Sequence, residues 1–176
     1  PYTLNENTTF YAKYVAGYQV TYNLNGGKWD GATTFSENEG ATVRITSMIP
    51  RKDGYTFKGW TTDDVTITGN TFTMPNHNVT LTAQWEKSTF NLTVNYVYED
   101  GSEAATTHTE TVDFEKSYRV PSPSITGYTP NEEVVSGTMP AEDVTVTVTY
   151  TANSYKVTYN YGTAPAGATT LPAEQT

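Results

Sequence analysis

The sequence contains no cysteine, few cationic residues and no long apolar run. Without cysteine, no disulfide can hold small segments together, and thiol chemistry and cysteine-ligated metal sites are excluded. Ten Lys and Arg residues stand against 19 Asp and Glu, so the formal net charge is -9. Because like charges repel phosphate, nucleic acid and anionic membranes are disfavoured as partners. No apolar run approaches the roughly 20 residues that a membrane-spanning helix requires, so we expect no membrane insertion.

The composition favours strands over helices. Threonine supplies about a fifth of the 176 residues and tyrosine another 14, whereas leucine and alanine are sparse. β-branched and aromatic residues are enriched in strands. Alternation of apolar and polar residues recurs along the chain, and no window keeps the spacing of three and four that an amphipathic helix requires. We therefore predict a mostly β fold, α+β at most.

One alternating pattern occurs three times, and each copy ends in a large aromatic residue. In Val79–Trp85 and Val144–Tyr150 every second residue is apolar, with threonine at most positions between, and Thr8–Tyr14 is the third copy. Recurrence of one strand at wide spacing is typical of tandem repeats. The pattern therefore indicates an array of small modules.

A second template, in which aromatic or apolar residues alternate with polar ones, begins at Tyr18, Phe90 and Tyr155. Each copy follows closely on a copy of the first pattern, so the linkers, at 86–89 and 151–154, are short. Short linkers limit bending and favour an elongated, semi-rigid rod of modules. We predict a tail strand of a preceding repeat at 1–15, a complete module at 18–87, a second at 90–152, and the first hairpin of an incomplete repeat at 154–176.

Turn signals divide the modules into strands. Asn25–Gly27 is a strong reversal signal because Asn and Gly tolerate positive φ, and Pro50–Gly54 also indicates a turn. Gly127–Thr129 and Thr138–Pro140 in the second module occupy the places of similar residues in the first. We expect strands over 33–37, 41–46, 55–60, 65–72 and 79–85 in the first module, and from 90, near 106–114 and over 144–150 in the second.

Each module carries its own set of motifs. The first contains Tyr18–Asn23, Asn25–Gly27, Gly54–Trp60 and Leu81–Trp85, and the second contains Val94–Gly101, Ile125–Tyr128 and Val144–Tyr150. By these motifs, residues 18–87 resemble the internalin B-type repeat, also called the Listeria-Bacteroides repeat, and residues 90–152 are similar to the mucin-binding-protein type of repeat.

The resemblance implies modules of a β-grasp-like fold in a bacterial surface protein, secreted or associated with the cell wall. Neither family brings a catalytic residue or a cofactor. The second module lacks an equivalent of Gly59–Trp60, so its core aromatic residue must come from elsewhere, for example Tyr118 or Tyr128.

The two end segments have two explanations. A lone strand or hairpin is marginal in water, so the chain is either an excerpt of a longer array or a subunit whose ends complete each other between chains. In the second case, the tail of one copy adds a strand to the hairpin of the next, giving a head-to-tail filament. The apolar side chains that would pair are Phe10, Ala12, Tyr14, Tyr155, Val157 and Tyr159.

Residues that carry chemistry are scarce. His77 and His108 are the only histidines, and no cluster around them has metal-ligand spacing, so we expect neither a metal site nor a catalytic triad. Most aromatic residues fall on alternating positions and are expected in the core. Trp29 breaks the alternation within a turn, which makes it a candidate exposed contact for a sugar or a protein.

The expected function is a non-enzymatic, extracellular repeat or stalk segment of a bacterial surface protein, serving adhesion or spacing. The alternatives are a subunit of a head-to-tail extracellular filament and a glycan- or mucin-binding module. The expected partners are other repeats of the same or neighbouring chains, or a host or cell-surface glycoprotein. We expect no cofactor.

Overall fold

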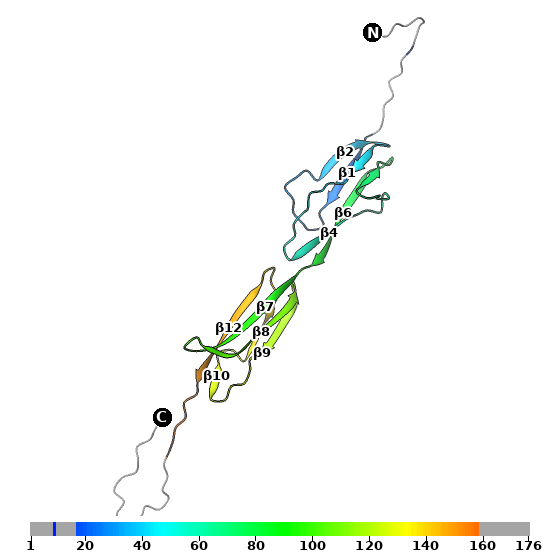
Figure 1. Ribbon diagram of the computed structural model, residues 1–176. Helices are drawn as coiled ribbons and strands as arrows, with labels where there is room; N and C mark the ends of the chain where they lie inside the picture. Colours follow the sequence, from blue (N-terminus) through cyan, green and yellow to red (C-terminus); the bar gives the residue numbers. More distant parts are fainter. Residues whose placement is uncertain (1–8, 10–16, 159–176) are drawn as a thin grey trace, which may run out of the picture. The chain divides into compact units, whose positions relative to one another are not determined.

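The computed structural model describes Thr9 and residues 17–158, which form two compact units divided between residues 88 and 89 (Figure 1). All regular elements within these residues are strands, so the prediction of a mostly β fold is confirmed. The β-grasp identity of the modules stays a prediction. The units are described here one at a time.

The first unit is built on a sheet with the strand order β2-β1-β6-β4. Its first and last strands, β1 and β6, are parallel neighbours in the middle of the sheet, and β2 and β4 pair antiparallel on the outside. Two short strands, β3 and β5, form a separate antiparallel pair. The strands are β1 Gly17–Asn23, β2 Thr34–Asn38, β3 Thr42–Arg44, β4 Tyr55–Thr61, β5 Thr71–Thr73 and β6 Val79–Lys87.

The predicted alternation decides which residues of the first unit are buried. In β6, Val79, Leu81 and Ala83 are fully buried and Thr80 is exposed, because successive side chains of a strand point to opposite faces. The buried core consists of Val20, Tyr22, Val43, Ile45, Phe72, Met74, Val79 and Leu81.

The second unit repeats this topology strand for strand. Its sheet has the order β10-β12-β7-β8, with β7 and β12 parallel in the middle, and β9 pairs with β11 as β3 pairs with β5. The strands are β7 Thr89–Tyr98, β8 Glu103–Asp113, β9 Ser117–Pro121, β10 Tyr128–Pro130, β11 Val134–Thr138 and β12 Val144–Ala152.

Single hydrogen bonds recur at equivalent places in the two units. The backbone N–H of Gln19 donates to Asn78 Oδ1 over 2.9 Å, and that of Asn91 donates to Asp143 Oδ1 over 2.8 Å. Met74 and Met139 are both almost completely buried. The two modules, which carry different motifs, therefore share one strand arrangement down to individual side chains.

The core aromatic residues of the second unit are Tyr96 and Tyr150, which are 3% and 0% exposed. Tyr150 donates its hydroxyl to the carbonyl of Pro123 over 2.6 Å, which satisfies the one polar group of a fully buried ring. The expectation that Tyr118 or Tyr128 takes this place is wrong. Tyr118 is half-buried at the edge of the core, and Tyr128 is exposed beside Tyr98.

One expected strand differs from the structure, and two observed strands were not expected. Only Thr71 and Phe72 of the predicted strand at 65–72 belong to a named strand, because the chain reverses between Thr68 and Thr71 around Gly69, whose φ is 63°. Val65 and Ile67 still pack on the core, which explains why their alternation looked like a strand. β9 and β11 were not expected, since both are short and close to prolines.

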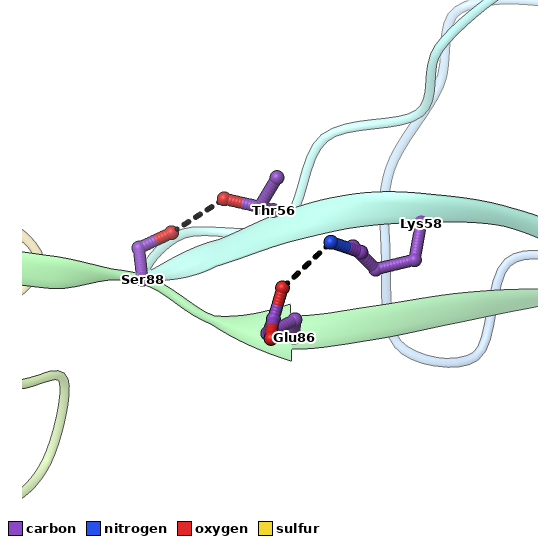
Figure 2. Close-up of polar contacts among 4 residues, drawn as sticks. All are labelled: Thr56, Lys58, Glu86 and Ser88. Atoms are coloured by element: carbon purple, nitrogen blue, oxygen red, sulfur yellow. Dashed lines mark hydrogen bonds and ion pairs between the residues drawn. The ribbon is translucent and has the colours of Figure 1, made fainter.

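The end of the first unit is fixed by contacts between β4 and the residues that close β6. Figure 2 shows Thr56 reaching Ser88, with 2.9 Å between the hydroxyl oxygens, and Lys58 Nζ lying 2.8 Å from Glu86 Oε2. Ser88 also donates its backbone N–H to the carbonyl of Gly54. Ser88 is the one residue between β6 and β7, so strand replaces most of the linker expected at 86–89.

Candidate functional site

The Asn25–Gly27 reversal shapes one end of the first unit. Asn25 and Gly26 have φ values of 49° and 83°, as a β-turn with positive φ at both central positions requires. Gly27 has no room for a side chain, because a Cβ there would lie 2.5 Å from Cζ2 of Trp85. The Trp85 indole donates to the carbonyl of Leu24 over 3.0 Å, so the turn is held against this ring.

Beyond the turn, Lys28 lies directly opposite Arg51. Each donates its backbone N–H to the carbonyl of the other, over 2.7 and 2.8 Å, in an antiparallel bridge. Residues paired in this way project their side chains to the same side. Both residues are exposed, and within the described part of the chain neither forms an ion pair. The bridge therefore places two unneutralised cations side by side.

Trp29 is half-buried rather than exposed. Its ring centroid lies 5.2 Å from that of Tyr22 and 6.0 Å from that of Trp60, and Gly31 lies against its indole nitrogen. This nitrogen has no hydrogen-bond partner among the described residues. Trp29 leaves the strand alternation because the turn directs its ring onto the aromatic cluster. Its role as a ligand contact stays a prediction.

These residues border an open hollow of about 570 Å³, within the range of about 300–1,000 Å³ for small-molecule pockets. We call it the Lys28 hollow. Met48 and Ile49 line it and are 50% and 71% exposed, although large apolar side chains are usually buried. The hollow thus combines exposed hydrocarbon with charged side chains, three cationic and two acidic. It is lined by Gly26, Lys28, Trp29, Asp30, Met48, Ile49, Arg51, Lys52 and Asp53.

Lys52 differs from the other two cations of the hollow because its ammonium group already has partners. It donates to the carbonyl of Asn25 over 3.2 Å and lies 4.4 Å from the centre of the Tyr55 ring. A cation over an aromatic face is attracted by the ring quadrupole. Lys28 and Arg51 are therefore the two cations left for a ligand.

Sequence reasoning missed Lys28 and Arg51. The available signal is that three of the ten Lys and Arg residues of an acidic chain fall within or next to the turns at 25–27 and 50–54. What the sequence does not show is that these two turns lie together, because 23 positions separate Lys28 from Arg51.

Burial raises the pKa of the Tyr22 phenol, and the hydrogen bond that its oxygen accepts from the N–H of Thr46 partly opposes this shift. Tyr22 therefore stays neutral at physiological pH. Its uncharged hydroxyl holds the loop that leads to Met48 and Ile49.

The other candidates from the sequence lie apart from this hollow. Tyr155 and Val157 are 68% and 48% exposed, whereas Phe10, Ala12, Tyr14 and Tyr159 lie outside the described residues. Their pairing between chains stays a prediction.

The structure also locates the two histidines. His77 is exposed, and Nε2 of the half-buried His108 lies 3.8 Å from Glu110 Oε1. In residues 17–158, no group of three His, Asp or Glu side chains could hold a metal ion. The same residues contain no helix long and apolar enough to cross a membrane.

Comparisons with known proteins match the two units to two families. Residues 18–89 match the family model of the divergent InlB B-repeat domain, and residues 91–162 match that of the MucBP domain. The resemblances drawn from the sequence motifs are therefore confirmed.

Several solved structures are similar to parts of the chain. The MucBP domain of the adhesion protein from Pediococcus pentosaceus is 26% identical and covers 38% of this chain and 100% of its own, with a TM-score of 0.33. The type 2 repeat of the mucus binding protein MUB from Lactobacillus reuteri is 20% identical over 78% of this chain and 99% of its own, with a TM-score of 0.35. The streptococcal tandem repeat (SHIRT) domains 3-4 from a cell surface protein are 16% identical over 77% and 99%, with a TM-score of 0.30.

By both the motifs and the matched ranges, the first unit is similar to divergent InlB B-repeat domains, and the second unit is similar to MucBP domains.

Proposed function

We propose that this chain is a load-bearing, non-enzymatic repeat segment of a bacterial surface protein, which holds an adhesive surface away from the cell. The observation that carries the proposal is the parallel pairing of the first and last strands in the middle of each unit. Because these strands run in the same direction, the chain enters a unit at one end of the sheet and leaves it at the other.

The registers give the length of this path. Val20 pairs with Val79 in the first unit and Leu92 pairs with Val144 in the second. In both units the opening strand begins three positions before this pair, and the closing strand ends eight positions after it. At roughly 3.3 Å per residue, each unit therefore advances the chain by about 36 Å. Equal steps are what a spacer built of repeats requires.

The hydrogen bonds between the two central strands also suit a segment under tension. A pull on the ends of one unit displaces the opening and closing strands along each other, so all the hydrogen bonds between them are loaded together. If the same strands were peeled apart, the bonds would break one after another. The path of the chain thus supports a role in bearing load.

The families support a location outside the cell and a role in adhesion. The names of the similar proteins describe an adhesion protein, a mucus binding protein and a cell surface protein. By this likeness, the partners of this chain are neighbouring repeats and glycoproteins, and it acts at the cell surface or as part of a secreted protein.

Surface display on a non-adherent bacterial host tests the proposal. Cells that carry the chain on a wall anchor should remain on mucin-coated glass under flow, whereas cells with the anchor alone should wash off. In a second arm, the chain is placed between the anchor and a biotin-binding domain, and it should increase capture by biotinylated glass. No gain over the anchor alone in the first arm, and none over the biotin-binding domain joined directly to the anchor in the second, would contradict the proposal.

We keep filament assembly by strand addition as a second proposal, since Tyr155 and Val157 expose large apolar side chains at alternating positions. Deletion of residues 1–15 should then reduce the mass of the assembly measured by light scattering. An unchanged mass would reject strand addition through this segment.

A further inference from the structure

The opposition of Lys28 and Arg51 is unfavourable for the isolated fold. Like charges directly opposite each other on paired strands destabilise the pairing. No carboxylate forms an ion pair with either side chain within residues 17–158, although Asp30 and Asp53 line the same hollow. The chain has an excess of nine negative charges, so the two adjacent cations do not follow from a generally basic composition.

We propose that the Lys28 hollow binds the anionic group of an acidic saccharide, either a carboxylate or a sulfate ester, with Lys28 and Arg51 as its two cationic contacts. An arginine side chain presents a planar fork that matches two oxygens of such a group, and a lysine adds a compact charge beside it. Binding of the anion removes the repulsion between the two cations, so the site is complete only with its ligand.

The apolar side of the hollow favours a saccharide as the carrier of the anion. Met48 and Ile49 present hydrocarbon to solvent, and Trp29 forms part of the wall. A sugar ring carries C–H groups that pack on such a surface while its substituents reach the polar side. An extended acidic peptide would instead be expected at an unpaired strand edge. The overall negative charge of the chain disfavours a nucleic acid.

This inference deepens the adhesive part of the proposed function. It can be tested with the full chain, isotope-labelled for nuclear magnetic resonance and titrated with sialyllactose, sulfated lactose and plain lactose up to about 10 mM, a concentration suited to weak sites. We expect saturable shifts at the amides of Lys28 and Arg51 and at the indole of Trp29 with one or both acidic sugars. Sialyllactose reports on a carboxylate and sulfated lactose on a sulfate ester. Shifts that are absent with both, or equally large with plain lactose, would overturn the proposal.

A charge-matched pair of variants separates this site from general electrostatic attraction. The double variant K28Q/R51Q should bind the acidic sugar at least about tenfold more weakly, because both charge-assisted contacts are lost. Its melting temperature should be unchanged or higher, because a like-charge pair is removed. The control K116Q/R119Q makes the same change of net charge at exposed residues of the second unit and should keep the affinity. Equal weakening in both variants would reject the site.

The outcomes also distinguish this inference from the proposed function. If displayed cells adhere to mucin but the hollow binds neither acidic sugar, the site is wrong and the surface role stands. The opposite result is also possible: the hollow binds an acidic sugar, but displayed cells neither adhere to mucin nor gain capture by biotinylated glass. In that case the proposed function is wrong.

Discussion

At the scale of the residue, a few side chains determine how the turn at one end of the first unit packs and how the stability of the cores depends on pH. Gly27 and Trp85 hold the turn beside the Lys28 hollow, and buried tyrosines occupy both cores. Two predictions concern these residues.

Gly27→Ala should destabilise the first unit by about 1–3 kcal/mol, as is usual when an extra methyl group is forced into a packed site. The added Cβ would lie 2.5 Å from the Trp85 ring and 3.1 and 3.2 Å from the carbonyl oxygens of Leu24 and Arg51. Urea denaturation followed by tryptophan fluorescence measures the change. Gly17→Ala is the control, since its Cβ would meet atoms no closer than 3.9 Å. Equal effects of the two substitutions would contradict the packing described here.

Alkaline pH should destabilise the second unit through its buried tyrosines. Burial raises the pKa of Tyr96 and Tyr150 above the ordinary value of 10.0. The folded state therefore holds these protons at a pH where the unfolded state has lost them, so the contribution of the two tyrosines to the free energy of unfolding should be fully present below pH 10 and be lost as the pH rises above it. Urea denaturation by circular dichroism at a series of pH values measures this fall.

Tyr96→Phe provides the matched variant. It removes one of the titrating hydroxyls and keeps the ring, so it should reduce the alkaline loss and change the stability little at neutral pH. An alkaline loss as large as that of the parent chain would show that Tyr96 does not contribute to it.

At the scale of the element, β4 shows why the sequence pattern predicts a strand but not its internal irregularity. The alternation of Tyr55 and Phe57 predicts a strand, and the strand is present, but Trp60 is out of phase with it. A bulge resolves the conflict: Phe57 pairs with Trp85, Trp60 pairs with Ala83, and Lys58 is the extra residue. Phe57 and Trp60 therefore lie on one face, with ring centroids 5.3 Å apart.

Gly59 makes this bulge possible, since its backbone φ of 120° is a conformation that residues with a side chain rarely adopt. Gly59→Ala should cost about 1–3 kcal/mol of backbone strain, although nothing lies within 4 Å of the new Cβ. The loss of stability should appear in urea denaturation together with a shift of tryptophan emission as Trp60 is displaced. A neutral effect would mean that the bulge does not depend on glycine.

The strands that the sequence predicted best are those whose alternation is long and complete. β6 and β12 alternate over their full length and were expected almost as observed, whereas β9 and β11 are short and depend on pairing with each other. The opposition of Lys28 and Arg51 was beyond prediction for the same reason, because it arises from a single bridge between two distant turns. Local patterns therefore predict the longer strands, whereas the candidate site is formed by long-range pairing that such patterns do not show.

At the scale of the molecule, two units with different motifs share one arrangement of six strands each, with the first and last strands parallel at the centre. This common feature gives each unit an entry and an exit at opposite ends. The proposed load-bearing role depends on it more than on any single residue.

Single-molecule force spectroscopy on the first unit tests this claim most directly, and the absence of natural cysteine allows defined attachment points. In the chain G17C/K87C, force acts along β1 and β6 and loads their hydrogen bonds together; in G17C/H77C, it peels the strands apart from one end. We predict an unfolding force at least about twofold higher for G17C/K87C, since all hydrogen bonds of the parallel pair must yield at once. Equal forces, or a lower force for G17C/K87C, would contradict the load-bearing account.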